Sequence, residues 1–167
     1  MNMNPRCLSA KYFVRKLQES DIDAIYDLSR GNALFYRYHP PFVTRESIRD
    51  DMRALPPGKD CDDKFYIGFF ENDKLAAVMD MICGYPSEGV FFIGLFMLDA
   101  SRQGQGVGTG IIADCLAYWK ELGYQKVRLG VDKGNPQSNA FWSKNGFHPI
   151  EEKTSAPYVF VLMERDL

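Results

Sequence analysis

The sequence predicts one α/β (α+β) domain over residues 1–167, on the basis of its length, its composition and the order of its strand-like and helix-like segments. A chain of 167 residues is close to the usual size of a single domain. Apolar residues make up 46% and charged residues 25%, which is the average balance of a globular protein. The segments follow one another as β-α-α-β-β-β-α-β-α-β-β, without an internal repeat, which favours one sheet packed against helices.

The first part of the chain predicts a strand followed by two helices. Residues 11–17 alternate apolar and polar side chains, as a half-buried strand does. One helix is expected between a cap at Ser20-Asp21 and Gly31, and the next is capped by Thr44. Residues 36–42, between these helices, are aromatic and contain two prolines, so we expect a stiff surface segment there. The spacing within the second helix predicts burial of Ile48, Met52 and Leu55.

The middle of the chain predicts a hairpin and a central strand. Residues 65–70 and 75–83 are strand-like runs, and the polar residues 71–74 between them form a turn. Residues 90–98 are apolar on both faces, which is typical of a strand that is covered on both sides.

The C-terminal part predicts a helix, a strand, a second helix and two closing strands. The first helix ends near Gly123, and residues 127–131 form the strand. Asn135-Pro136 begins the second helix, because an asparagine cap followed by proline is a favoured start, and Gly146 ends it. The closing strands are residues 147–150 and 158–163. The apolar face of the first helix consists of Ile111, Ile112, Cys115, Leu116 and Trp119.

Charge and cysteine content narrow the classes of partner. The 20 basic and 22 acidic side chains give a net charge of −2, whereas a nucleic-acid-binding domain or a protein of anionic membranes usually has a basic excess. The four cysteines lack metal-ligand spacing, so we expect no metal and free thiols. The longest apolar run, residues 89–98, is too short to span a bilayer, which needs about 20 residues. We therefore expect a cytoplasmic protein that binds neither nucleic acid nor a membrane.

The strongest local motif is Gln103-Gly104-Gln105-Gly106-Val107-Gly108-Thr109-Gly110, between a buried strand and a helix. Glycine lacks a Cβ, so a ligand can lie directly against the backbone. The first amides of the following helix have no partner within the helix and point outward at its positive end, an arrangement that binds phosphate. The motif therefore predicts a phosphate site.

Two known phosphate motifs fit this segment less well. The P-loop pattern G-x-x-x-x-G-K-[ST] is absent. The dinucleotide pattern G-x-G-x-x-G/A matches Gly108, Gly110 and Ala113, with Asp132 as a ribose ligand. However, these glycines begin several residues after the strand, and the chain beyond Asp132 lacks further βαβ units.

A second motif distinguishes between these possibilities. Residues 135–147 open a helix just after the next strand, and Asn135, Trp142, Gly146 and Phe147 match the pattern N-x(6)-aromatic-x(3)-G-F. Together with Q-x-x-G-x-G at Gln103, Gly106 and Gly108, this resembles the GNAT superfamily of acyl-CoA-dependent N-acetyltransferases. The resemblance implies a mixed, mostly antiparallel sheet of about seven strands, flanked by four helices, with a splayed central parallel pair.

The resemblance also implies a site for acetyl-CoA. The amides of the glycine loop would bind the pyrophosphate, and the end of the preceding strand would pair with the pantetheine arm. The Leu98 amide would polarise the thioester carbonyl. Asn135 would hold the arm from the other side, Trp142 would pack against it, and Lys144 is a candidate for the 3′-phosphate. The implied cofactor-binding residues are Phe96, Met97, Leu98, Gln103, Gly104, Gln105, Gly106, Val107, Gly108, Thr109, Asn135 and Trp142.

The general acid and base stay unassigned. Many relatives have a tyrosine at the Trp142 position, but indole cannot donate a proton near neutral pH. The glutamate that some relatives use as a base is Gly130 here. An alkylamine with a pKa near 10.4 is only about 0.1% neutral at pH 7.4, a handicap of roughly 4 kcal/mol. Asp80, Tyr85 and Tyr158 are candidates, although a structural hydrogen bond for Asp80 and packing for the two tyrosines are the favoured explanations.

The resemblance predicts transfer of acetyl from acetyl-CoA to a primary amine of a small molecule or peptide, by direct attack. Residues 36–42 lie where relatives build the acceptor pocket, while His39 alone indicates little. A homodimer is compatible with the resemblance, because relatives often pair through sheet edges. The alternatives are a non-catalytic acyl-CoA sensor or scaffold, which the Trp142 substitution keeps open, and a dinucleotide-binding oxidoreductase.

Overall fold

The computed structural model describes residues 3–167 and contains one seven-stranded sheet with the order β1-β2-β3-β4-β5-β7-β6. Every neighbouring pair of strands is antiparallel except β4 and β5, which are parallel, so the predicted mixed sheet is confirmed. The strands are β1 (Phe13–Lys16), β2 (Lys64–Glu71), β3 (Lys74–Cys83), β4 (Val90–Leu98), β5 (Lys126–Asp132), β6 (His148–Ser155) and β7 (Tyr158–Asp166).

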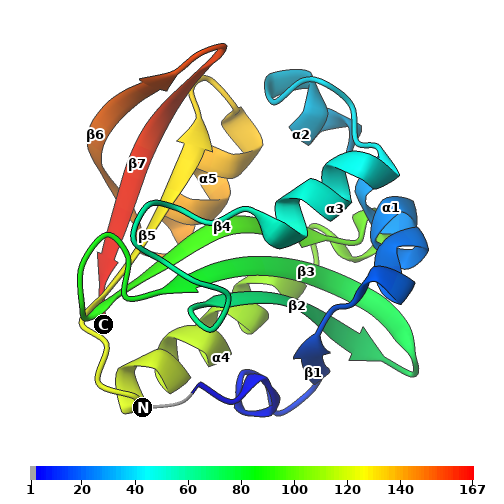
Figure 1. Ribbon diagram of the computed structural model, residues 1–167, viewed down its shortest axis with the longest axis horizontal. Helices are drawn as coiled ribbons and strands as arrows, with labels where there is room; N and C mark the ends of the chain where they lie inside the picture. The colour runs from blue at the N-terminus through cyan, green and yellow to red at the C-terminus, as the bar shows by residue number, and fades with distance from the viewer. Residues whose placement is uncertain (1–2) are drawn as a thin grey trace.

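Helices cover both faces of the sheet. Figure 1 shows α1 and α3 in front of the strands and α4 behind them. The apolar face predicted for α4 is buried against the rear face, together with Trp142 of α5, and α1 and α3 pack on the opposite face. The helices are α1 (Ile22–Arg30), α2 (Ala33–Tyr38), α3 (Arg45–Arg53), α4 (Val107–Glu121) and α5 (Pro136–Lys144).

The prediction of four helices is wrong because α2 was not predicted from the sequence. This helix has only six residues, none of them fully buried, so it lacks the apolar periodicity of a longer amphipathic helix. Its N-cap, Asn32, makes no side-chain capping bond, because its side-chain oxygen accepts from Gln103 instead. The amide nitrogen of Asn32 donates to the carbonyls of Leu28 and Leu98. The helix ends at Tyr38, and its C-cap His39 directly precedes a proline, where helical geometry is disfavoured.

Two further boundaries differ from the prediction. Leu55 was expected on the buried face of α3, but it is 41% exposed because the helix ends at Arg53 and Ala54 is extended. Strands β6 and β7 are also longer than the apolar runs that predicted them. Every residue of β6 is exposed, so this edge strand carries no apolar alternation that could reveal its length.

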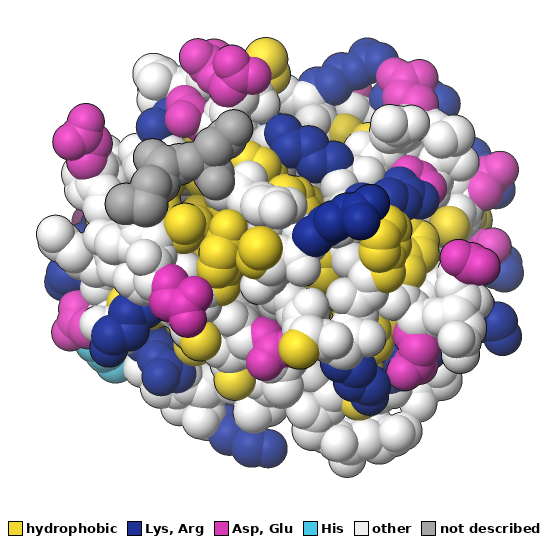
Figure 2. Space-filling view, turned by 90° about the horizontal axis from the view of Figure 1, so that it is seen from below, with side chains coloured by type: hydrophobic (Ala, Val, Ile, Leu, Met, Phe, Trp, Pro, Cys, Tyr) yellow, Lys and Arg dark blue, Asp and Glu magenta, His cyan; other side chains and the backbone are white. Residues whose placement is uncertain are grey.

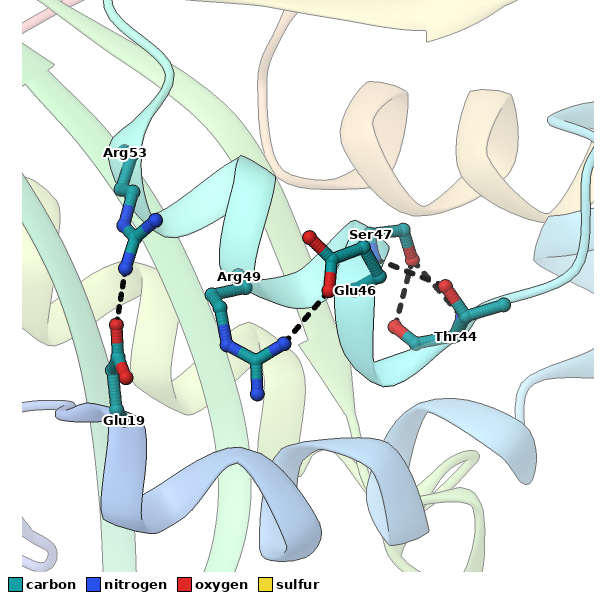
Figure 3. Close-up of polar contacts among 6 residues, drawn as sticks. All are labelled: Glu19, Thr44, Glu46, Ser47, Arg49 and Arg53. Atoms are coloured by element: carbon teal, nitrogen blue, oxygen red, sulfur yellow. Dashed lines mark hydrogen bonds and ion pairs between the residues drawn. The ribbon is translucent and has the colours of Figure 1, made fainter.

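A capping box and two arginine contacts hold α3 in place (Figure 3). The Thr44 hydroxyl accepts from the Ser47 amide at 3.0 Å, and the Ser47 hydroxyl accepts from the Thr44 amide at 3.0 Å. Arg49 pairs with Glu46 within the helix. Arg53 donates to Glu19 in the 3-10 turn before α1, and this contact joins the ends of the two helices that cover the front face.

The parallel pair opens in the middle of the sheet. Strands β4 and β5 pair only from Val90–Lys126 to Ile93–Leu129, and the next residue on each strand, Gly94 and Gly130, is an exposed glycine. Gly94 is also the extra residue of a β-bulge opposite β3. The predicted splay is therefore present, and two residues without side chains border it.

The outer surface shows no concentration of one charge on the face drawn in Figure 2. Seen from below, over the N-terminal segment, β1 and α4, basic and acidic side chains are interspersed with apolar ones. Within residues 3–167, none of the helices combines the length and the apolar character that crossing a bilayer requires.

Candidate active site

A cavity of about 310 Å³ lies where the glycine-rich loop, the start of α4, the end of β4 and one side of α5 meet. This volume is in the range of small-molecule sites. Of the residues predicted from the sequence, the cavity is lined by Phe96, Met97, Leu98, Gln103, Gly104, Gly106, Val107, Gly108, Thr109 and Trp142. Lys144 also lines it, and the sequence did not indicate Asn32, Phe35, Gln137, Ser138 and Phe141.

Two of the predicted residues, Gln105 and Asn135, do not line this cavity. The Gln105 side chain folds back and donates to the Ser101 carbonyl at 2.9 Å. Asn135 is 1% exposed, and its side-chain oxygen caps α5 by accepting from the Ser138 amide at 3.2 Å. The expected contact of Asn135 with pantetheine therefore stays a prediction, whereas its role as a helix cap is confirmed.

The glycine-rich loop presents its backbone to the cavity. Gly104 and Gly106 have positive φ angles of 72° and 78°, which side-chain-bearing residues rarely adopt. A Cβ added at either position would meet no atom within 4 Å, so the space above this backbone is open. Gly106 caps α4 without a side-chain bond, which leaves the first amides of the helix free for an anion.

Gln103 fixes the loop relative to the rest of the site. Its amide nitrogen donates to the Asn32 side chain at 2.7 Å and to the Leu98 carbonyl at 3.1 Å. Its side-chain oxygen accepts from Gln137 of α5 at 3.2 Å. One side chain thus joins the loop to the end of β4, to the junction before α2 and to α5.

A smaller cavity of about 60 Å³ occupies the opening between β4 and β5. Gly94 and Gly130 line it, one from each strand. The smaller cavity adjoins the larger one, because four residues line both: Phe35, Phe96, Ser138 and Trp142. The β4 backbone beyond Ile93 no longer pairs with β5, so its groups on that side can pair with an extended ligand.

Trp142 forms part of an aromatic cluster at the junction of the two cavities. Its side chain is 7% exposed and meets Phe141 and Phe147 edge to face, with ring centroids 4.9 and 5.1 Å apart. Phe96 also lies edge to face at 6.1 Å. The indole is therefore a rigid apolar wall of the site.

None of the three acid–base candidates from the sequence lines either cavity. Asp80 pairs with the buried Lys64, whose ammonium lies 2.8 Å from Oδ1 and 2.9 Å from Oδ2, with the hydrogen bond directed to Oδ2. Burial raises the pKa of Asp80, and Lys64 opposes this shift. The Tyr158 hydroxyl donates to the Pro40 carbonyl, and Tyr85 packs edge to face on Phe92.

The structure joins two residues that the sequence did not connect. His39 Nδ1 lies 3.0 Å from Asp132 Oδ1, at the end of β5. Asp132 is 8% exposed and lines the smaller cavity. Since 93 residues separate the two, no local spacing could have revealed the pair. The dinucleotide interpretation of Asp132 is wrong, because the sheet has a single parallel pair rather than a doubly wound order.

Comparison with known proteins identifies the fold and a family. Residues 22–147 match the model of the Acetyltransferase (GNAT) family. The structure is similar to an acetyltransferase from Thermus thermophilus, with a TM-score of 0.75 and 19% identity over 92% of this chain and 96% of that one. It is also similar to Ard1 from Thermoplasma volcanium, with a TM-score of 0.68 and 20% identity over 95% and 99% of the two chains.

A third similar structure contains a ligand. The PaiA N-acetyltransferase from Thermoplasma acidophilum, in complex with coenzyme A, has a TM-score of 0.65 and 18% identity, covering 92% of this chain and 98% of that one. No curated protein sequence matches the chain.

Proposed function

Since the chain belongs to the GNAT acetyltransferase family, we propose that it transfers an acetyl group from acetyl-CoA to a primary amine of a small molecule or peptide. The amine attacks the thioester carbonyl directly: the new N–C bond forms, the C–S bond breaks, and coenzyme A leaves as the thiol. The free cysteines and the near-neutral charge balance support a cytoplasmic enzyme with no nucleic-acid or membrane partner.

The observation that carries this proposal is the open backbone at the start of α4. The two positive-φ glycines and the uncapped first turn leave amide donors facing an open space with no side chain in the way. A diphosphate fits this cradle, because helix N-termini bind anions through main-chain donors and the helix dipole. The coenzyme A complex of the PaiA N-acetyltransferase supports the same class of ligand.

The remaining parts of acetyl-CoA match the rest of the site. Lys144, which lines the cavity, is suited to the 3′-phosphate. The unpaired backbone of Phe96 to Leu98 would hold the pantetheine arm as an added strand, with the Leu98 amide as a donor to the thioester oxygen. The arm would then lead past Trp142 into the opening between Gly94 and Gly130.

The test compares two glycine variants with the same backbone requirement. Gly106 and Gly123 flank α4, have φ angles of 78° and 87°, and have no atom within 4 Å of an added Cβ. Gly106→Val and Gly123→Val therefore carry a similar strain, but only Gly106 lies in the loop. We expect Gly106→Val to lose coenzyme A binding in calorimetry while Gly123→Val retains it. If Gly106→Val binds as tightly as the wild type, the loop assignment is wrong.

Activity is tested with acetyl-CoA and a panel of spermidine, L-lysine, kanamycin and the peptide Ala-Ala-amide. Acetylated products are measured by mass spectrometry, because the exposed thiols of Cys7 and Cys61 would add to a colorimetric thiol signal. We expect acetylation of at least one amine. Tight coenzyme A binding without any acetylated amine would favour a non-catalytic acyl-CoA sensor or scaffold.

A further inference from the structure

The proposed reaction needs a proton acceptor, and the cavities contain few candidates. A primary amine is mostly an ammonium ion at neutral pH, and it becomes a nucleophile only after losing a proton. Among the described residues that line the two cavities, Lys144 and Asp132 are the only charged ones. Lys144 is a cation and lines only the larger cavity, whereas Asp132 borders the opening between the strands.

Asp132 holds an imidazole beside this opening. A carboxylate only accepts hydrogen bonds, so Nδ1 of His39 is the donor in the 3.0 Å contact, and in the neutral imidazole the lone pair then lies on Nε2. No hydrogen bond with residues 3–167 engages Nε2. The His39 side chain is 32% exposed and lines neither cavity itself, but Asp132 and Phe35, which it contacts, both line the opening between the strands.

Aromatic contacts restrict the ring on its other sides. The imidazole stacks on Tyr158 of β7 with centroids 4.1 Å apart and an angle of 11° between the planes. Phe35, which lines both cavities, lies 5.5 Å away. The Tyr158 hydroxyl also bonds the carbonyl of Pro40, the residue after His39, so the same tyrosine fixes ring and backbone. Figure 1 shows α2 and the turn between β6 and β7 at the same end of the molecule.

We propose that His39 is the general base of the acetyl transfer and that Asp132 is its positioning residue. This inference rests on the proposed function. His39 Nε2 takes one proton from the acceptor ammonium, and the amine then attacks the thioester carbonyl. The second proton lost by the nitrogen goes to the departing sulfur, which leaves as the thiol, and the imidazolium returns its proton to water.

The groups around His39 suit this role. Asp132 on β5 offers a negative charge to the imidazolium, Tyr158 on β7 presents its ring face, and Arg37 and Tyr38 precede it on α2. Asp51 of α3 is the other nearby carboxylate. Although its side chain keeps contact with solvent, partial burial raises the pKa of Asp51, while Lys64 and His39 oppose that shift.

The kinetic test uses the two histidines of the chain as a matched pair, because His148 on β6 is exposed and lines neither cavity. With acetyl-CoA and the amine of the panel that reacts fastest, we expect His39→Gln to lower kcat by on the order of 10²-fold or more. Its KM for acetyl-CoA and its coenzyme A affinity should not change. The residual rate of His39→Gln should rise steeply with pH toward the pKa of the amine itself, because without the base the reaction depends on amine that has already lost its proton. His148→Gln should match the wild type.

The positioning role of Asp132 is tested by nitrogen NMR of protein labelled with ¹⁵N-histidine, which needs no acceptor. The His148→Gln variant leaves His39 as the single histidine, so its signals are unambiguous. We expect the Nδ1–H tautomer in that protein, and its loss when Asp132→Asn is added. An Nε2–H tautomer before that change overturns the assignment of Asp132.

The outcomes separate this inference from the proposed function. If the wild type acetylates an amine and His39→Gln does so at the same rate, His39 is not the base, although the proposed function stands. If the wild type acetylates none of the amines while the Nδ1–H tautomer is present, the proposed reaction fails and the role of His39 as its base fails with it.

Discussion

Gly108 and Gly110, in the first turns of α4, provide a matched pair that isolates the packing of the candidate cofactor cavity. A Cβ at Gly108 would lie 3.1 and 3.3 Å from two ring atoms of Phe141 and 3.6 Å from Phe96. A Cβ at Gly110 would meet nothing within 4 Å. Both glycines are helical, so alanine at either position gains about 0.5–1 kcal/mol from helix propensity.

The two alanine variants should therefore differ by the steric term alone. Overpacking a core by one carbon costs about 1–3 kcal/mol of unfolding free energy. The Phe141 ring needs to shift by only a few tenths of an ångström, so we expect a steric cost of about 1–2 kcal/mol for Gly108→Ala. We expect Gly110→Ala to be more stable than the wild type. Gly108→Ala should melt about 2–8 °C below Gly110→Ala, since 1 kcal/mol corresponds to about 2–4 °C for a chain of this size.

Thermal denaturation followed by circular dichroism measures this difference. Calorimetry adds a second readout, because Phe141 lines the larger cavity and its displacement should weaken coenzyme A binding only in Gly108→Ala. Equal melting temperatures of the two variants would refute the packing argument. Equal coenzyme A affinities with different melting temperatures would show that the Phe141 ring does not contact the ligand.

Three further predictions concern buried charges and thiols. Burial alone would raise the pKa of Glu164, but hydrogen bonds from a lysine and an arginine hold it below the usual value. We expect Glu164→Gln to lose about 1–3 kcal/mol of unfolding free energy at pH 7. This loss should diminish as the pH falls through the lowered pKa, which urea unfolding at a series of decreasing pH values measures. Lys64→Met should cost about 3–5 kcal/mol by leaving Asp80 unpaired, and Asp80→Asn in the same chain should recover part of it. Ellman's reagent should titrate two thiols in the native protein, the exposed Cys7 and Cys61, and four in denaturant.

Local patterns predicted most of the fold because the signals act over a few residues. The two-residue turn at Asn72 and Asp73, both with positive φ, closes the hairpin that the polar segment predicted. Thr44 and Asn135 cap the helices that they were expected to begin. The α2 helix has no such signal, since its N-cap side chain bonds the end of β4 instead of its own first turn.

The sequence could predict only those parts of the candidate site that a single continuous segment forms. The glycine-rich loop supplies the cradle by itself, so its residues could be named from the sequence. The larger cavity also needs Asn32 and Phe35, which reach it only because α2 folds against the end of β4. The pairing of His39 with Asp132 depends on the same placement, and a partner 93 residues away leaves no pattern in the chain.

The opening between β4 and β5 follows from a specific irregularity of the sheet. Gly94 is the extra residue of the bulge opposite Asp80, and a Cβ there would lie 3.0 Å from Asp80 Oδ2. The carboxylate thus occupies the space that a side chain at position 94 would need, and Lys64 keeps it there. Because β4 bends at this bulge, its ladder with β5 ends one residue earlier, at Ile93. Asp80 and Lys64, which lie beside Tyr66 on the face of the sheet that α1 and α3 cover, therefore shape the opening, although neither lines a cavity.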